Sequence, residues 1–360
     1  MNITTLTLQN KSPISIYYIG QFGTSGYAQA ARGYLFDYFS RGIPITWEPL
    51  YFDDSKLNND DLYDIVIKSL IYKDIEDYNM VILHSTPDLW PTFWIEKYNK
   101  LKDRVVNGYC TWETSILPKP WVKNINSTVN EVWCPSNYNK TIFSNSGVNI
   151  PIRVVPHIFL PKQLPEREKI VLIDSLTGEQ INNSGRYTFY SIGEFNARKG
   201  ISELLHTYCQ TFTDEDNVQL IIKTHYKSYS PENIGMCRTL FDDILKEYSN
   251  PPRIICLLGN MSSDEMLALH SLGDCYISLT KSEGFGLTIF DAFNYGKKII
   301  VTNGGGHLDF LGTNYSGLVD AKIGKVEGMD TFNTMYSGAQ DWFIPDLDHA
   351  SYLMKKISNL

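Results

Sequence analysis

The chain has 360 residues, of which 43% are hydrophobic, 20% charged and 13% aromatic. This length corresponds to about two domains, each long enough to bury its own core, so a disordered chain or a small disulfide-stapled scaffold is excluded. The 32 basic and 40 acidic side chains give a formal charge of −8. Because binding to a nucleic-acid duplex needs a large cationic face, this balance argues against a general nucleic-acid-binding protein.

The start of the chain and the cysteines indicate a compartment. Residues 1–11 lack a cationic segment followed by an apolar block, so we expect no secretion signal. No stretch approaches the ~18–20 consecutive apolar residues of a membrane span. The six cysteines are scattered singly without a Cys-x-x-Cys pair. We therefore expect a cytoplasmic protein with reduced thiols and no structural zinc.

Short apolar runs alternate with longer mixed segments along the first half of the chain. Such alternation is typical of a parallel sheet with helices on both faces. A helix is expected over 25–42, where small and aromatic residues share one face. The expected strands are 14–20, 43–50, 80–85, 104–110 and 131–136.

The segment 151–169 carries four prolines and a run of charges, so we interpret it as a linker. A second alternating series follows it. We therefore predict an α/β protein with two doubly wound, Rossmann-like domains that face one another, with the ligand between the carboxyl ends of both sheets. The expected strands are 187–195, 218–225, 253–259, 274–280 and 298–304, and the expected helices are 201–212, 262–272 and 287–295.

A first glycine cluster, Gly20, Gly23 and Gly26, lies between a predicted strand and a predicted helix. It fits a dinucleotide-binding loop with Glu48 as the acidic partner, a loop that approaches a phosphate or substrate, or a plain tight turn. An NAD-dependent epimerase or reductase would also need a Tyr-x-x-x-Lys pair in mid-chain. Tyr352 with Lys356 has this spacing but is at the far end of the chain, which weakens the nicotinamide interpretation.

A more specific pattern occupies residues 281–312. Glu283 follows a predicted strand and precedes Gly284-Phe285-Gly286, a helix is expected from Leu287, and Asp291 comes eight residues after Glu283. The N–H groups at the start of a helix are unpaired, and the helix dipole there favours anions, so a diphosphate fits this position. Glu283 can accept hydrogen bonds from sugar hydroxyls, and Asp291 from ribose hydroxyls.

The segment EGFGLTIFDA (283–292) resembles the EGFGLxxxEA signature of the family-four retaining glycosyltransferases, which have the GT-B fold. Residues 111–159 resemble the end of that family's N-terminal domain, and 193–201 its basic phosphate loop. Residues 340–357 are similar to the segment that enters its terminal helices. The resemblance covers most of the chain from residue 14 onward. It implies an N-terminal acceptor-binding domain (1–162), a C-terminal nucleotide-sugar-binding domain (163–338) and a segment (339–360) that returns toward the first domain.

The resemblance also implies an activity: transfer of a sugar from a nucleotide donor, with retention of configuration and without a bound metal. In the family, a basic pair and a helix N-terminus stabilise the leaving diphosphate. Arg198 and Lys199 match the Arg-Lys-Gly part of the phosphate loop, but Glu194 stands where the family often has arginine. Lys223, at the end of the next predicted strand, is a candidate substitute. Asp291 replaces the commoner glutamate, and its reach is shorter by about one methylene.

In the first domain, His84 ends a predicted strand where family members commonly place a histidine, and it could orient or deprotonate the acceptor hydroxyl. A packing role is the alternative. The aromatic residues Trp90, Trp94 and Trp112 could stack on an acceptor sugar or pack in the core. The Asp-x-Asp strings at 214–216 and 346–348 are expected to be turns or caps, so we predict no metal.

The sequence thus predicts a metal-independent, retaining glycosyltransferase with no resident cofactor. The expected partners are a nucleotide-sugar donor and a glycan, lipid-linked or protein acceptor. Peripheral contact with a membrane stays open, as do the base, the sugar and the oligomeric state. The alternatives are an NAD-dependent nucleotide-sugar epimerase and a non-catalytic sugar-binding protein on the same fold. We predict His84, Glu283 and Lys199 as catalytic, and as donor-binding Gly23, Arg198, Lys199, Lys223, Glu283, Gly284, Phe285, Gly286, Leu287 and Asp291.

Overall fold

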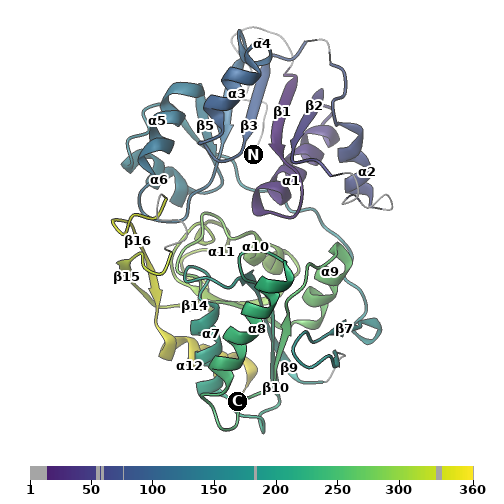
Figure 1. Cartoon of the computed structure of the whole chain (residues 1–360), viewed down its shortest axis with the longest axis vertical. Helices are drawn as coiled ribbons and strands as arrows, with labels where there is room; N and C mark the ends of the chain where they lie inside the picture. Colours follow the sequence, from purple (N-terminus) through teal and green to yellow (C-terminus); the bar gives the residue numbers. More distant parts are fainter. Residues whose placement is uncertain are drawn as a thin grey trace. The chain divides into compact units, whose positions relative to one another are not determined.

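A computed structural model describes residues 14–53, 57, 61–75, 77–181, 185–329 and 335–359. The chain forms two compact units, which we call the first and the second unit (Figure 1). The first comprises Met1–Trp112 and Ile116–Leu160, and the second comprises Glu113–Ser115 and Pro161–Leu360. The second unit therefore includes the segment Glu113–Ser115, which is flanked in sequence on both sides by residues of the first unit.

The first unit contains one parallel six-stranded sheet in the order β2-β1-β3-β4-β5-β6. The order reverses between β1 and β3, which leaves an opening at the carboxyl ends of these two strands. The five strands predicted for this half are confirmed. Its strands are β1 (Ile16–Gln21), β2 (Ile45–Leu50), β3 (Met80–His84), β4 (Val105–Tyr109), β5 (Glu131–Cys134) and β6 (Ile152–Val154), and its helices are α1 (Gly26–Ser40), α2 (Leu62–Ser69), α3 (Trp90–Glu96), α4 (Tyr98–Leu101), α5 (Lys119–Thr128) and α6 (Asn137–Asn145).

Strand β6 corrects one prediction, because it lies at the start of the segment that was interpreted as a linker. Ile152 pairs with Val132 and Val154 with Cys134, so three residues extend the sheet at its edge. Prolines on either side of a short strand are tolerated at an edge, where one side of the backbone needs no partner. The chain passes into the second unit after Leu160.

The second unit contains another parallel six-stranded sheet, in the order β11-β10-β9-β12-β13-β14. The order reverses between β9 and β12. All strands and helices predicted for this half are confirmed. The strands of this sheet are β9 (Tyr187–Glu194), β10 (Val218–His225), β11 (Ile254–Leu257), β12 (Cys275–Ser278), β13 (Lys298–Thr302) and β14 (Leu318–Val319). Two short antiparallel pairs lie outside it: β7 (Leu172–Ile173) with β8 (Gln180–Ile181), and β15 (Ala321–Lys325) with β16 (Asp341–Pro345). The helices are η3 (Arg167–Lys169), α7 (Ile201–Thr211), α8 (Pro231–Leu245), α9 (Ser263–Leu272), α10 (Leu287–Asn294), α11 (Leu308–Leu311) and α12 (Leu347–Ser358).

Alternate residues of each strand supply a core on each face of this sheet, because successive side chains point to opposite sides. In β9, Phe189 belongs to the core that contains α7, α8 and α12, whereas Tyr190 belongs to the core that contains α9 and α10. Ile222 and Ile221 of β10 divide in the same way. Helices therefore cover both faces, and the doubly wound α/β prediction is confirmed.

The last helix, α12, packs against α7 in the second unit. Its apolar face, Ala350, Leu353 and Met354, is buried in the same core as Leu204 and Leu205. The described part of the segment 339–360 thus completes the second unit, and its predicted return toward the first domain stays a prediction. Among the described residues, none of the helices is both long enough and apolar enough to cross a membrane.

Candidate active site

The predicted phosphate loop and the Glu283 loop lie at the same edge of the second sheet. Arg198 and Lys199 follow β9, and Glu283 follows β12. These two strands are neighbours at the point where the strand order reverses. In open α/β sheets, ligands bind outside the carboxyl ends of the strands at such a point. The fold therefore places the predicted cations and the predicted carboxylate where a ligand is expected.

Glu283 is an ionised carboxylate held between two cations. Lys199 Nζ lies 2.5 Å from Oε1, and Arg198 Nη1 lies 3.4 Å from Oε2. The Thr280 hydroxyl also donates to Oε1, at 3.2 Å. Glu283 is only 8% exposed. Burial by itself raises the pKa of Glu283, but the charges of Lys199 and Arg198 outweigh it and lower the pKa to about 2.

The Arg198 guanidinium is held by several polar contacts. Its Nη1 donates to the Ser282 carbonyl at 2.9 Å, and its Nη2 lies 3.6 Å from Glu113 Oε1. Burial lowers the pKa of Arg198, but the carboxylates of Glu113 and Glu283 more than compensate, so the guanidinium stays charged. Tyr336 donates to the other Glu113 oxygen at 3.3 Å. Sequence reasoning missed Glu113, which comes from the segment that joins the second unit.

The glycines of the loop 284–287 fix its path. Gly286 has a φ of 87° and forms the N-cap of α10, a left-handed conformation that residues with a side chain adopt at a cost. Phe285 is buried and packs against Phe290 and Phe310, so its side chain is a core group. The N–H of Gly306 donates to the Glu283 carbonyl at 2.7 Å and ties the loop to the next one. Any donor contact of Phe285 would therefore be made by its backbone.

Asp291 lies one turn into α10, and its carboxylate has no hydrogen-bond or ion-pair partner among the described residues. Burial raises its pKa to about 7. A partly buried carboxylate without a partner is costly, which makes it suited to accept hydrogen bonds from a ligand. Its contact with ribose hydroxyls stays a prediction.

Lys223 is a buried cation at the same sheet edge. It is 6% exposed and pairs across the sheet with Ile192, beside Gly193. Its Nζ lies 2.8 Å from the Tyr229 hydroxyl, but it has no carboxylate partner among the described residues. Burial lowers its pKa to about 8. Glu194, which stands where a family member often has arginine, accepts from the Asn196 side chain at 3.0 Å.

The other predicted site residues, Gly23 and His84, belong to the first unit. Gly23 has a φ of 117° in the turn between β1 and α1, and an added Cβ there would meet nothing within 4 Å. His84 ends β3, pairs with Gly20 of β1 and is 1% exposed. Its Nδ1 lies 2.5 Å from the Tyr18 hydroxyl. Both residues lie at the point where the strand order of the first sheet reverses.

The residues considered for a dinucleotide site, a metal site or acceptor stacking have other contacts or positions in the structure. The Glu48 carboxylate binds Lys97 and, at 3.0 Å, Lys100, so two lysines neutralise the acidic group that a dinucleotide loop would use. Tyr352 is 57% exposed on α12. As expected, the Asp-x-Asp strings form a turn and a cap: Asp216 accepts from the Thr213 N–H, and Asp346 caps α12. The indole N–H groups of Trp90, Trp94 and Trp112 bond to Ser85, Thr128 and Ile116, and Trp90 and Trp112 are core residues.

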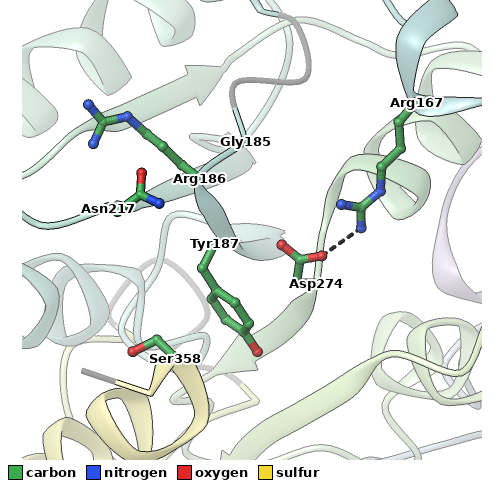
Figure 2. A pocket seen from close by; sticks show the side chains of 7 residues that line it. All are labelled: Arg167, Gly185, Arg186, Tyr187, Asn217, Asp274 and Ser358. Atoms are coloured by element: carbon green, nitrogen blue, oxygen red, sulfur yellow. Dashed lines mark hydrogen bonds and ion pairs between the residues drawn. The ribbon is translucent and has the colours of Figure 1, made fainter.

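A hollow of about 410 Å³ lies at the opposite edge of the second sheet, near the amino ends of β9 and β12 (Figure 2). Its two arginines are already engaged: Arg167 lies 2.7 Å from Asp274, and Arg186 donates to the Asp216 carbonyl at 2.9 Å. Among the described residues that line it, neither arginine is therefore free to bind a phosphate, and the hollow lies at the other end of the strands from Glu283.

Comparison with known proteins agrees with this geometry. Residues 176–322 match the model of the family "Glycosyl transferases group 1". The matched residues all lie in the second unit. Within the matched range are Arg198, Lys199, Lys223, Glu283 and Asp291. The predicted resemblance is confirmed, whereas the retaining mode stays a prediction.

The proteins that this chain is similar to are distant. "Uncharacterized protein 356" of Sulfolobus islandicus rod-shaped virus 1 is 22% identical over 211 residues, which span 58% of this chain and 54% of that protein. HepE of Anabaena, solved with UDP and glucose, is 14% identical over 96% of this chain and 95% of its own, with a TM-score of 0.55. The sucrose-phosphate synthase of Thermosynechococcus elongatus is 12% identical over 96% and 89%, with a TM-score of 0.60. These structures confirm the GT-B fold.

Proposed function

We propose that this protein is a retaining glycosyltransferase that moves a sugar from a nucleotide diphosphate donor to a hydroxyl of a glycan, lipid-linked or protein acceptor. The observation that carries the proposal is the buried Glu283 carboxylate between Lys199 and Arg198, beside the start of α10. A carboxylate that is kept ionised can bind sugar hydroxyls, and adjacent cations can bind phosphate. Both functions are needed within a few ångströms of each other in a sugar-diphosphate site.

The leaving diphosphate gains negative charge as the glycosidic bond breaks. Lys199 has three N–H donors, so it can keep its bond to Glu283 and still contact a phosphate oxygen. The helix dipole at the start of α10 and the Arg198 charge act in the same direction. Lys223 is a third cation at this edge, and we assign it the position left open by Glu194. Protein cations then do the work that a metal does in other transferases, and we propose that the reaction is metal-independent.

The remaining contacts follow from the same loop. Glu283 would bind hydroxyls of the transferred sugar, and Asp291 would bind the ribose. Gly284, Phe285, Gly286 and Leu287 would contribute backbone groups. In the first unit, Gly23 would allow close approach of the donor, and His84 would act at the transferred sugar or the acceptor. We propose a cytoplasmic location, where nucleotide sugars are available.

A thermal-shift screen with UDP-, GDP-, ADP- and dTDP-sugars, followed by hydrolysis of the best binder in the presence of a chelator, tests the proposal. Lys199→Met should lower the hydrolysis rate by about 10²–10³. Lys281→Met is the matched control, because Lys281 is similarly buried but pairs with Glu203, at 2.6 Å. It should retain the rate within severalfold.

Three results would contradict the assignment. The first is a melting curve that no nucleotide or nucleotide sugar shifts. The second is stabilisation by NAD alone, which would favour the epimerase alternative. Donor binding without any hydrolysis or transfer would indicate a sugar-binding protein on the same fold.

A further inference from the structure

His84 of the first unit makes a hydrogen bond that bears on its chemistry. Tyr18 is in β1 and His84 ends the neighbouring strand β3. The Tyr18 hydroxyl lies 2.5 Å from His84 Nδ1, and both residues are 1% exposed. Because both partners are enclosed, the direction of this bond determines which nitrogen of the imidazole carries its proton.

Counting hydrogens fixes that direction. The Tyr18 hydroxyl has no other hydrogen-bond partner among the described residues. If Nδ1–H donated to Tyr18, the phenolic hydrogen would be buried without an acceptor, at a cost of about 1–3 kcal/mol. If the phenol donates, the phenolic hydrogen has an acceptor, and the imidazole hydrogen lies on Nε2, which is not among the fully enclosed polar atoms without a partner. A neutral imidazole whose Nδ1 accepts a hydrogen bond carries its proton on Nε2.

The surroundings also keep the imidazole neutral. The rings of Tyr27, Tyr34 and Tyr109 lie 5.4, 6.0 and 4.5 Å from the His84 ring, centre to centre. Burial, with a smaller contribution from His157, lowers the pKa of His84 well below its ordinary value. No carboxylate contacts the ring among the residues that the structure describes. A histidine that acts as a base becomes cationic, and a carboxylate at its second nitrogen normally stabilises that charge.

We propose that Tyr18 is a positioning residue that holds His84 as the Nε2–H tautomer, so that His84 donates a hydrogen bond to a substrate oxygen and does not act as a general base. Nε2 is the group through which it can do so, since this nitrogen has no partner among the described residues. The part of the proposal that concerns substrate rests on the proposed glycosyl transfer. The assignment of the tautomer does not depend on the proposed glycosyl transfer.

The tautomer is measured on the ligand-free protein by ¹⁵N NMR of labelled histidine, with the His84 ring assigned by its loss in His84→Gln. We expect a protonated Nε2 and an unprotonated Nδ1, and a changed Nδ1 signal in Tyr18→Phe. A protonated Nδ1 in the unmodified protein would overturn the proposal. This experiment needs no activity, so its failure leaves the proposed transfer untouched, and a failure of the transfer assay leaves the tautomer result standing.

The role in the reaction is tested by kinetics with the best donor. Tyr18→Phe should lower kcat about tenfold, the effect of one weakened hydrogen bond, with little change in KM. Tyr38→Phe is the matched control, because Tyr38 is a buried tyrosine of the same core without a hydrogen bond to His84, and it should stay within about twofold. His84→Gln, which keeps an N–H donor, should retain more activity than His84→Glu, which offers a base. More activity in His84→Glu, with both variants folded by thermal melting, would refute the donor role.

Discussion

Replacing Glu283 by glutamine tests the charge arrangement at the centre of the site. The substitution keeps the size of the side chain and its contact with Thr280, but it removes the negative charge that Lys199 and Arg198 share. The pKa of Glu283 falls from the ordinary 4.5 to about 2 in the folded protein. At about 1.4 kcal/mol for each tenfold change, this difference corresponds to roughly 3 kcal/mol of stability at pH 7.

The pKa shift of Glu283 also predicts how the free energy of unfolding changes with pH. The folded protein binds this proton less readily than the unfolded chain, so the stabilisation is complete above about pH 4.5 and is lost as the pH falls toward 2. Glu283→Gln should therefore lower the free energy of unfolding at pH 7, and the difference from the unmodified protein should shrink in acid. Loss of one partner from a buried ion pair destabilises in the same direction.

The measurement must report on the second unit. Of the seven tryptophans, only Trp342 belongs to that unit, so urea unfolding is best followed by hydrogen exchange in β9 and β12. Glu166→Gln is the control, because Glu166 pairs with Lys169 on the surface and its loss should change stability by about 0.5 kcal/mol or less. An unchanged stability at pH 7, or a difference that persists undiminished at about pH 2, would refute the reasoning.

Two further predictions concern α10. Gly286→Ala should destabilise the second unit by about 1–2 kcal/mol, because Gly286 has a positive φ. Gly235→Ala inside α8 is the control: an added Cβ there meets nothing within 4 Å, so this substitution should stabilise the unit slightly. Urea unfolding of both variants measures the two changes in stability. Because the pKa of Asp291 is about 7, affinity for the nucleotide should rise severalfold from about pH 6 to about pH 7.5, and calorimetry should find that Asp291→Asn removes this rise. A variant that keeps the rise would exclude Asp291 as its source.

The order of elements could be predicted because it depends on local signals. Buried strands of a parallel sheet are short apolar runs, and every run interpreted in this way is a strand. Helix α8 was missed, since Gly235 interrupts its apolar pattern, although Ser230 at the N-cap and Pro231 in the first turn are recognisable start signals. The short strands β15 and β16 pair across a gap in sequence and carry no strong pattern.

The site was predictable where its residues share one loop. Glu283, Gly286 and Asp291 lie within nine residues of sequence, and the spacing alone places them at a helix start. Glu113 could not be found in this way, because it reaches Arg198 from a segment that precedes it by 85 residues. The bond between Tyr18 and His84 likewise joins residues 66 positions apart, through the pairing of β1 with β3. Contacts of this kind follow from topology, which single-sequence periodicity does not encode.

The pattern of paired and unpaired charges in the second unit points to what the ligand must supply. Glu283, Lys199, Arg198 and Glu113 form a connected set of ion pairs without a ligand. Lys223 and Asp291, at the same edge, have no ion partner among the described residues, and burial shifts the pKa of each toward its neutral form. A phosphate would restore the charge of the lysine, and ribose hydroxyls would stabilise the carboxylate. In the proposed function one donor carries both groups, so its binding would relieve two desolvation costs at once, and the preformed ion pairs would hold the proposed sugar site in place.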